Sequence, residues 1–239
     1  MSAYVLVHGA WHGGWCWEKI TPLLERAGHV VIAPDLPGHG SDRTPLAEVT
    51  LERYVRRIGA AVDSLGESPI LVGHSMGGAV ISGVAEAYPE KVRTLVYLAA
   101  YLLGDGQAVL DVAGMDTDSS LLPILEWATD GLSASVPPAA ARAVFYGECS
   151  EADAAAATAR LVAQSVTPVT TPICVTQARF GRIPRVYVEC LRDRVVSPSA
   201  QRAMYSATPC ARVASLATDH SSFYSTPQAL ADILLSLSP

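Results

Sequence analysis

The most informative residues are a serine and the glycines that flank it, in the segment Gly73–Gly77. This Gly-x-Ser-x-Gly pattern follows the apolar run Ile70–Val72 and precedes the helix-like stretch Ala79–Tyr88. A strand, a sharp turn and a helix in that order form a nucleophile elbow, in which a strained backbone presents the serine hydroxyl above a sheet. A plain strand–helix turn can also contain glycine and serine, but this context favours Ser75 as a nucleophile.

A serine hydroxyl is a weak nucleophile and needs an adjacent general base. Around a nucleophile elbow the chain order is serine, then a carboxylate, then histidine. The six histidines are His8, His12, His29, His39, His74 and His220. Only His220 lies C-terminal both to the serine and to later carboxylates, so elimination predicts that His220 is the base.

A carboxylate must orient this base and stabilise its imidazolium form. The candidates are Asp105, Glu189, Asp193 and Asp219. Asp193 comes just after the apolar run Val186–Glu189, which places it at the same sheet edge as the serine. Glu189 lies within that run, and Asp219 would have to fold back onto its own neighbour. We therefore expect Asp193 to fill the role, with Asp105 as the alternative.

An oxyanion that develops on a substrate carbonyl needs two backbone N–H donors. One is expected from Met76, the residue after the nucleophile, and the other from the loop after the first strand. In that loop Gly9 permits a turn, so the N–H of Ala10 is the second predicted donor. A His-Gly pair that ends a strand is also compatible with a simple turn.

Alternating apolar and helix-like runs predict the scaffold of these residues. Apolar runs predict about six strands, at Tyr4–Val7, Val30–Ala33, Ile70–Val72, Leu95–Leu98, Val186–Glu189 and Val213–Leu216. Helix-like stretches lie between the early runs, at Ile20–Arg26, Leu51–Leu65 and Ala79–Tyr88. Near-continuous apolar strands separated by helices indicate a mostly parallel sheet with helices on both faces. With the elbow, this order predicts an α/β-hydrolase fold.

The alternation stops between Gly104 and Gly181. This length is too great for a plain loop, so we expect residues 104–181 to form a helical cap between two parts of the core, residues 1–103 and 182–239. Helix-like pieces within it are Leu121–Ala128 and Glu151–Ala163; a crossover with extra helices is the alternative. Four aromatic residues are candidates for substrate contact or for packing, namely Trp11, Trp127, Phe145 and Tyr146.

Composition argues against several other classes of protein. The formal charge is −6 and the basic residues form no run, so nucleic acid and anionic membranes are not expected partners. Five widely spaced cysteines without a CxxC pair predict no disulfide framework, no metal site and no cofactor, and favour a cytoplasmic location. The first residues do not resemble a signal peptide, and no apolar run is long enough to cross a bilayer. The oligomeric state is left open, a homodimer included.

With these residues in view, the sequence resembles the plant methyl esterase and hydroxynitrile lyase group, which includes the salicylic acid-binding methylsalicylate esterase. The likeness is carried by Val5–Trp15, Val72–Gly78, Tyr88–Ala100 and Arg185–Asp193, and it is weakest in the cap. The resemblance implies that Ser75, Asp193 and His220 match the family triad, and that Ala10 and Met76 match its oxyanion donors. The lyases of the group carry threonine where this chain has Gly9, and lysine where it has Ser221, so the chain is similar to the esterase branch.

Together these features predict a serine esterase that cleaves a small carboxylic ester through an acyl-enzyme. A thioesterase or cyclase of natural-product synthesis could use the same triad and stays open. A hydroxynitrile lyase and a ligand-binding receptor with a vestigial triad are disfavoured. An epoxide hydrolase or dehalogenase is also disfavoured, because those enzymes use an aspartate where this chain has Ser75.

Overall fold

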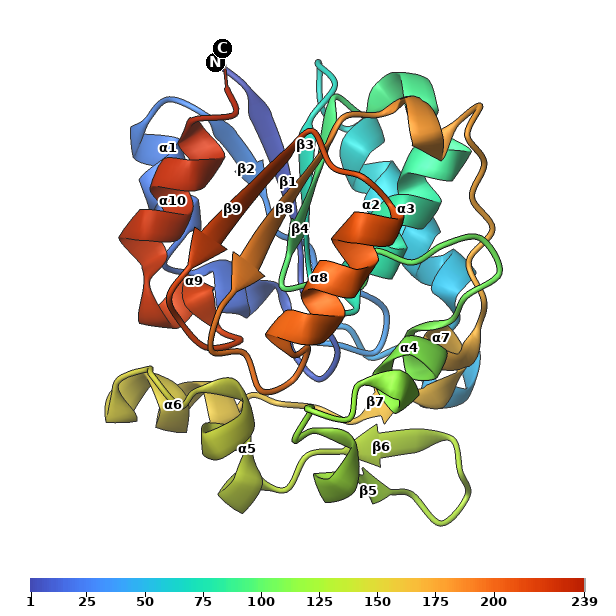
Figure 1. The fold of residues 1–239 in the computed structure, drawn as a ribbon, viewed down its shortest axis with the longest axis vertical. Helices are drawn as coiled ribbons and strands as arrows, with labels where there is room; N and C mark the ends of the chain where they lie inside the picture. Colours follow the sequence, from blue (N-terminus) through green and yellow to red (C-terminus); the bar gives the residue numbers. More distant parts are fainter. Residues whose placement is uncertain (239) are drawn as a thin grey trace.

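Six parallel strands form the central sheet of the computed structural model, which describes residues 1–238 (Figure 1). Each strand that the sequence predicted is present, so the prediction of an α/β-hydrolase fold with a parallel sheet is confirmed. The four inner strands of the sheet are almost wholly buried, as expected for a sheet covered on both faces. In order across the sheet the strands are β2 (Val30–Ile32), β1 (Ala3–Val7), β3 (Ile70–His74), β4 (Thr94–Leu98), β8 (Arg185–Cys190) and β9 (Arg212–Leu216).

Helices cover the two faces of this sheet (Figure 1). On one face lie α1 (Thr21–Arg26) and α10 (Pro227–Leu235), with the short α9 (Ser222–Ser225) before α10. On the other lie α2 (Leu51–Asp63), α3 (Gly77–Ala87) and α8 (Pro198–Ala207). The sequence of α2 shows why it is helical, since the hydroxyl of Thr50 accepts the N–H of Arg53 at its start and its buried residues recur at helical spacing.

The strand order places a crevice at the carboxyl ends of β1 and β3. The chain passes from β1 outward to β2, then returns to the other side of β1 to form β3 and continues from there to β4. In an open parallel sheet, a crevice forms at the carboxyl ends of the strands where the order reverses. Ala10 follows β1 and Ser75 follows β3, so two of the predicted functional residues lie at this reversal point.

Residues 104–181 are called the inserted segment below; residues 109–170 of it lie across the carboxyl ends of the strands, and residues 171–181 return along the side of the domain to the start of β8 (Figure 1). This segment is not purely helical. It has four helices, α4 (Val109–Met115), α5 (Pro138–Phe145), α6 (Glu151–Thr158) and α7 (Val166–Thr170). It also has a three-stranded antiparallel sheet of β5 (Glu126–Trp127), β6 (Ser133–Ser135) and β7 (Gln164–Ser165).

The helix expected at Leu121–Ala128 is wrong. A short 3₁₀ helix, Leu122–Ile124, is followed there by β5. The loop between β5 and β6 contains Asp130-Gly131, and Gly131 has a φ of 70°. An Asp-Gly pair is a hairpin signal because its glycine accepts positive φ, and this signal decides the local structure. The second expected helix, Glu151–Ala163, is present as the shorter α6.

Residues 1–238 contain neither a helix suited to span a membrane nor a cluster of side chains suited to hold a metal ion. No helix in that range is both long enough and apolar enough to cross a membrane. The same range contains no group of three or more histidine, cysteine, aspartate or glutamate side chains arranged to hold a metal ion.

Candidate active site

Ser75 lies on a strained turn between β3 and α3. Its φ is 53°, a left-handed value that costs a non-glycine residue about 1–2 kcal/mol. Three backbone hydrogen bonds hold the turn: Ser75 N–H donates to Leu98 C=O at 3.3 Å, and Ser75 C=O accepts from Gly78 N–H and Tyr101 N–H at 3.0 and 3.1 Å. The side chain lines a cavity at the end of the sheet. The predicted nucleophile elbow therefore has the expected backbone conformation.

The two glycines beside the serine are required by close packing. A Cβ atom on Gly73 would lie 2.6 Å from the carbonyl oxygen of Gly77, and one on Gly77 would lie 2.7 Å from that of Val7. Both distances are far below van der Waals contact with backbone atoms that cannot move aside. Strand, turn and helix can approach this closely only because these positions lack side chains.

His220 and Asp193 form a buried hydrogen-bonded pair. The Nδ1–H of His220 donates to Oδ2 of Asp193 at 2.7 Å. The second carboxylate oxygen accepts the N–H groups of Val195 and Val196 at 2.7 and 3.1 Å, which fixes the orientation of the carboxylate. With Nδ1 acting as donor, Nε2 of His220 is free to accept a proton.

His74, the neighbour of Ser75, positions the loop that carries His220. Its Nε2–H donates to the carbonyl oxygen of His220 at 3.0 Å, and the two ring centroids are 4.4 Å apart. Burial, together with the nearby His220 and His12, holds the pKa of His74 well below its usual value. His74 is therefore a neutral donor at neutral pH, and it brings the His220 backbone next to the serine turn.

Of the four carboxylates weighed from the sequence, Asp193 is the one that bonds to the His220 ring. The others have different partners, namely Val175 N–H at 3.0 Å for Asp105, Arg202 for Glu189, and Glu148 N–H at 2.8 Å for Asp219. The structure thus brings Asp193 and His220 together and leaves Asp105 elsewhere.

The predicted oxyanion donors, Ala10 and Met76, both line the cavity beside Ser75. No acceptor within residues 1–238 takes a hydrogen bond from either N–H group. The orientation of the Ala10 N–H is set by His8, whose Nδ1–H donates to Gly9 C=O at 2.8 Å. Because C=O and N–H point in opposite directions across a trans peptide, this bond turns the Ala10 N–H away from His8.

His8 can do this only as a neutral ring. Its Nε2 accepts the N–H of Leu36 at 3.0 Å, so the single ring proton must be on Nδ1. Complete burial lowers the pKa of His8 to about 3, with the nearby His39 adding to the effect. The ring therefore keeps this tautomer throughout the neutral pH range.

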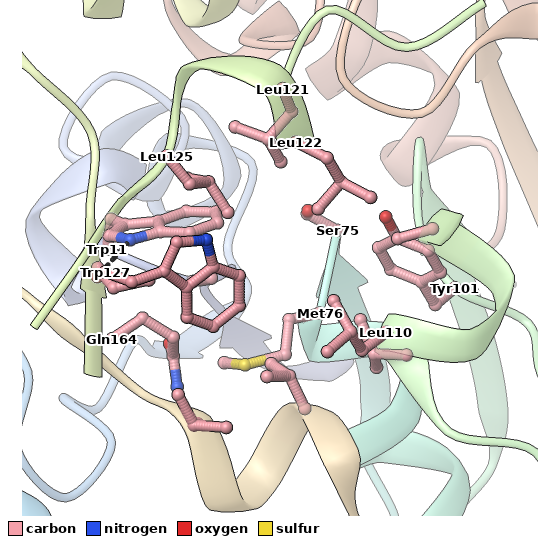
Figure 2. A pocket seen from close by; sticks show the side chains of 16 residues that line it. Trp11, Ser75, Met76, Tyr101, Leu110, Leu121, Leu122, Leu125, Trp127 and Gln164 are labelled. Atoms are coloured by element: carbon pink, nitrogen blue, oxygen red, sulfur yellow. Dashed lines mark hydrogen bonds between the residues drawn. The ribbon is translucent and has the colours of Figure 1, made fainter. Parts of the chain in front are cut away.

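The cavity, with about 510 Å³ of space between atoms that includes open solvent at its entrance, is lined almost entirely by apolar atoms (Figure 2). Trp11 and Trp127, two of the four candidate aromatic residues, line it, and Trp127 is half exposed. Phe145 and Tyr146 are instead buried against His12. The cavity is lined by Ala10, Trp11, Ser75, Met76, Tyr101, Val109, Leu110, Ala113, Leu121, Leu122, Leu125, Trp127, Ala134, Gln164, Val166 and Val169.

Comparison with known proteins places this geometry in a family. A model described as "Alpha/beta hydrolase family" matches residues 4–233, which is most of the chain. The chain belongs to the alpha/beta hydrolase family. The resemblance to plant methyl esterases is confirmed by relatives from two plants.

The chain is 32% identical over 249 residues to "Putative methylesterase 11, chloroplastic" of Arabidopsis thaliana, covering 98% of this chain and 63% of that protein. It is 34% identical over 218 residues to "Salicylic acid-binding protein 2" of Nicotiana tabacum, covering 83% of this chain and 82% of that protein. Among solved structures, a pyrethroid hydrolase from Sphingobium faniae JZ-2 matches with a TM-score of 0.88 and 32% identity, over 98% of this chain and 96% of that one.

In this alpha/beta hydrolase the inserted segment is hydrogen-bonded to residues 8–13, the loop after β1 that carries Ala10, a connection that the sequence did not reveal. Trp11, with a φ of 62°, donates its Nε1–H to Ala134 C=O at 2.9 Å and accepts the N–H of Val162 at 2.9 Å. The hydroxyl of Tyr146 donates to Nε2 of His12 at 2.8 Å.

His12 links Tyr146 to the backbone of Ala10, because the Nδ1–H of His12 donates to the carbonyl oxygen of Ala10 at 2.8 Å. Burial lowers the pKa of His12 to about 3, so the ring is neutral and can donate at one nitrogen while it accepts at the other. Tyr146, expected to be a substrate contact or part of a separate core, thus helps to hold the loop that carries the Ala10 N–H.

Proposed function

We propose that this chain is a serine hydrolase that cleaves a small, mainly apolar carboxylic ester through an acyl-enzyme. The observation that carries the proposal is the buried Ser75 turn that lines an apolar cavity, with the N–H groups of Ala10 and Met76 on the same cavity wall and a buried His220–Asp193 pair packed against the neighbouring His74. The names of its relatives, methylesterases and a pyrethroid hydrolase, support ester hydrolysis.

In the proposed mechanism Ser75 Oγ attacks the ester carbonyl while Nε2 of His220 takes the serine proton. The N–H groups of Ala10 and Met76 stabilise the oxyanion, and the loss of one such donor typically lowers kcat by about 10²–10³-fold. His220, as imidazolium held by Asp193, then protonates the departing alcohol. A water molecule, deprotonated by His220, hydrolyses the acyl-enzyme by the same steps.

The inserted segment acts in this proposal as a lid over the acyl group. The alcohol leaves first, whereas the acyl group stays bonded to Ser75 until water attacks, so an enclosed apolar cavity suits the acyl group. No lysine or arginine is among the residues that line it. A neutral acyl group is therefore favoured over an anionic one.

A lyase reaction is less well supported. The resemblance implies that lyases of the group use a lysine after the catalytic histidine to stabilise a leaving cyanide. Here that position is Ser221, whose hydroxyl is buried and has no partner within residues 1–238. No cation at this position would stabilise cyanide.

Labelling of the nucleophile tests the proposal. With 4-nitrophenyl butanoate the enzyme should release a burst of nitrophenol that matches the enzyme concentration, and a fluorophosphonate should add one adduct detected by intact mass. The Ser75→Ala variant should lose both, whereas Ser82→Ala, a change at a buried serine of α3, should keep both. An adduct and full turnover in Ser75→Ala would overturn the proposal. Parallel assays with the butanoyl thioester distinguish an esterase from a thioesterase.

A further inference from the structure

Tyr101 is fixed beside the nucleophile by the backbone. It follows β4, and its N–H donates to the carbonyl oxygen of Ser75 at 3.1 Å. Helix α3 packs directly on this part of the chain, since a Cβ atom on Gly78 would lie 2.5 Å from the carbonyl oxygen of Tyr101. The position of the Tyr101 ring relative to Ser75 is thus set by rigid elements, not by a flexible loop.

The hydroxyl of Tyr101 reaches the cavity with no hydrogen-bond partner. The side chain is only 4% exposed, yet it lines the cavity, and Figure 2 shows its hydroxyl end on the Ser75 side. No side-chain hydrogen bond within residues 1–238 includes this oxygen, and the atom is accessible from the cavity.

The other buried polar side chains of the cavity wall already have hydrogen-bond partners within the protein. Gln164 bonds to His39 at 2.9 Å and to Ser165 C=O at 2.8 Å. The indole N–H of Trp11 bonds to Ala134 at 2.9 Å. Besides Ser75, one buried side chain of the described cavity wall therefore keeps a donor that a ligand can use. That donor is the Tyr101 hydroxyl.

Because the Tyr101 hydroxyl faces an apolar cavity, a ligand oxygen in that cavity can become its hydrogen-bond partner. Burial, with Asp193 and Asp116 nearby, raises the pKa of Tyr101, so the phenol stays protonated and can donate at any pH at which the protein works. A ligand oxygen beside the Tyr101 hydroxyl could accept its hydrogen bond, and no hydrogen bond within the protein would have to break.

We propose that Tyr101 is a specificity-determining residue, and that it selects acyl groups that carry an oxygen atom in addition to the ester oxygens. The ester carbonyl oxygen is directed to the N–H groups of Ala10 and Met76, which leaves the phenol for a second oxygen, such as an ether, hydroxyl or keto group. This inference rests on the proposed function and names the class of acyl group that the same site prefers.

The test compares two esters that differ by one atom, 4-nitrophenyl methoxyacetate and 4-nitrophenyl butanoate, in which an ether oxygen replaces a methylene. For each protein the ratio of their kcat/KM values is measured, so that the intrinsic reactivity of the two esters cancels between proteins. Tyr101→Phe should lower the ratio about tenfold relative to the wild type, the value of one hydrogen bond. An equal loss with both esters, or an unchanged ratio, would overturn the proposal.

The matched control is Tyr187→Phe, because the Tyr187 hydroxyl donates to Ala100 C=O at 2.8 Å away from the cavity. This variant should lower the thermal midpoint and leave the ratio unchanged. Tyr101→Phe should keep its midpoint, since no protein hydrogen bond is lost. A lower midpoint for Tyr101→Phe would show that the hydroxyl serves the fold and would count against the proposal.

Binding separates this inference from the proposed function. If the wild type hydrolyses neither ester, the proposed function fails. The same two esters are then titrated into Ser75→Ala and into Ser75→Ala/Tyr101→Phe, with the fluorescence of Trp11 and Trp127 as the signal. The inference holds if the double variant loses the preference for the methoxyacetate. It fails if both proteins bind the two esters in the same ratio.

Discussion

Mild acid should destabilise this protein strongly, because two buried histidines on either side of Ala10 resist protonation. Burial is the main cause that lowers the pKa of both His8 and His12 to about 3. In the unfolded chain each pKa returns to 6.5. Between pH 6.5 and pH 3 the unfolded state therefore binds more protons than the folded state. Stability is fully present above this window and is lost as the pH falls through it.

The size of the effect follows from these two values. For each histidine, the free energy of unfolding at pH 5 is lower than at pH 7 by about 2 kcal/mol, since one pKa unit corresponds to about 1.36 kcal/mol. The pair together gives about 4 kcal/mol. His39 and His74, whose pKa values are also lowered by burial, act in the same direction. A typical domain has only about 5–15 kcal/mol of stability, so pH 5 should bring the protein close to unfolding.

Urea unfolding at pH 7 and pH 5, followed by tryptophan fluorescence and circular dichroism, measures the difference directly. The His12→Gln variant serves as the matched comparison. It should be less stable at pH 7, but its loss between pH 7 and pH 5 should be smaller than that of the wild type by about 2 kcal/mol. Two results would contradict this prediction. One is the same unfolding free energy of the wild type at both pH values, and the other is a loss of unfolding free energy in His12→Gln as large as that of the wild type.

Three further changes test the site. Asp193→Asn should lower kcat by about 10⁴-fold without unfolding the protein, whereas Asp105→Asn should have little effect; steady-state kinetics that reverse this order would reassign the carboxylate. Gly9→Ala should lower kcat at least tenfold, because its Cβ atom would lie 2.8 Å from the Cβ of Ser75 and force the turn to shift; an unchanged kcat would show that the turn can yield. Trp127→Ala should change the preference among acyl chain lengths more than the thermal midpoint, since this side chain is 49% exposed; a variant that unfolds with its ester profile intact would assign Trp127 to packing.

The sequence was sufficient to predict the sheet because its strands are short apolar runs bounded by turns. It was also sufficient to predict that Ser75, Asp193 and His220 lie at the same edge of the sheet, because chain order along a parallel sheet decides which residues reach one edge; their catalytic roles stay a prediction. Their mutual distances depend on the packing of strands, which the order of residues alone does not specify.

The inserted segment was harder to predict. Its composition is rich in alanine, serine and threonine, and this weak pattern fits helix and strand equally well. The roles of His12 and Tyr146 depend on a contact between residues 134 positions apart in the chain, so no local signal could have indicated it. His74 was set aside as a base by chain order, and only the folded structure shows its bond to the His220 backbone.

Within residues 1–238, the non-glycine residues with a left-handed backbone conformation lie in the loops that follow three neighbouring strands of the sheet. Trp11, Ser75 and Ala99, with φ values of 62°, 53° and 43°, follow the neighbouring strands β1, β3 and β4. At about 1–2 kcal/mol each, these three residues together lower the free energy of unfolding by an amount comparable with the whole stability of a marginal domain. These positions are natural targets for a heat-resistant variant, yet relaxing Trp11 or Ser75 would reshape the loop that carries Ala10 or the serine turn. Stabilising substitutions in this protein are therefore better placed in the outer helices, where the backbone does not shape the serine turn or the loop that carries Ala10.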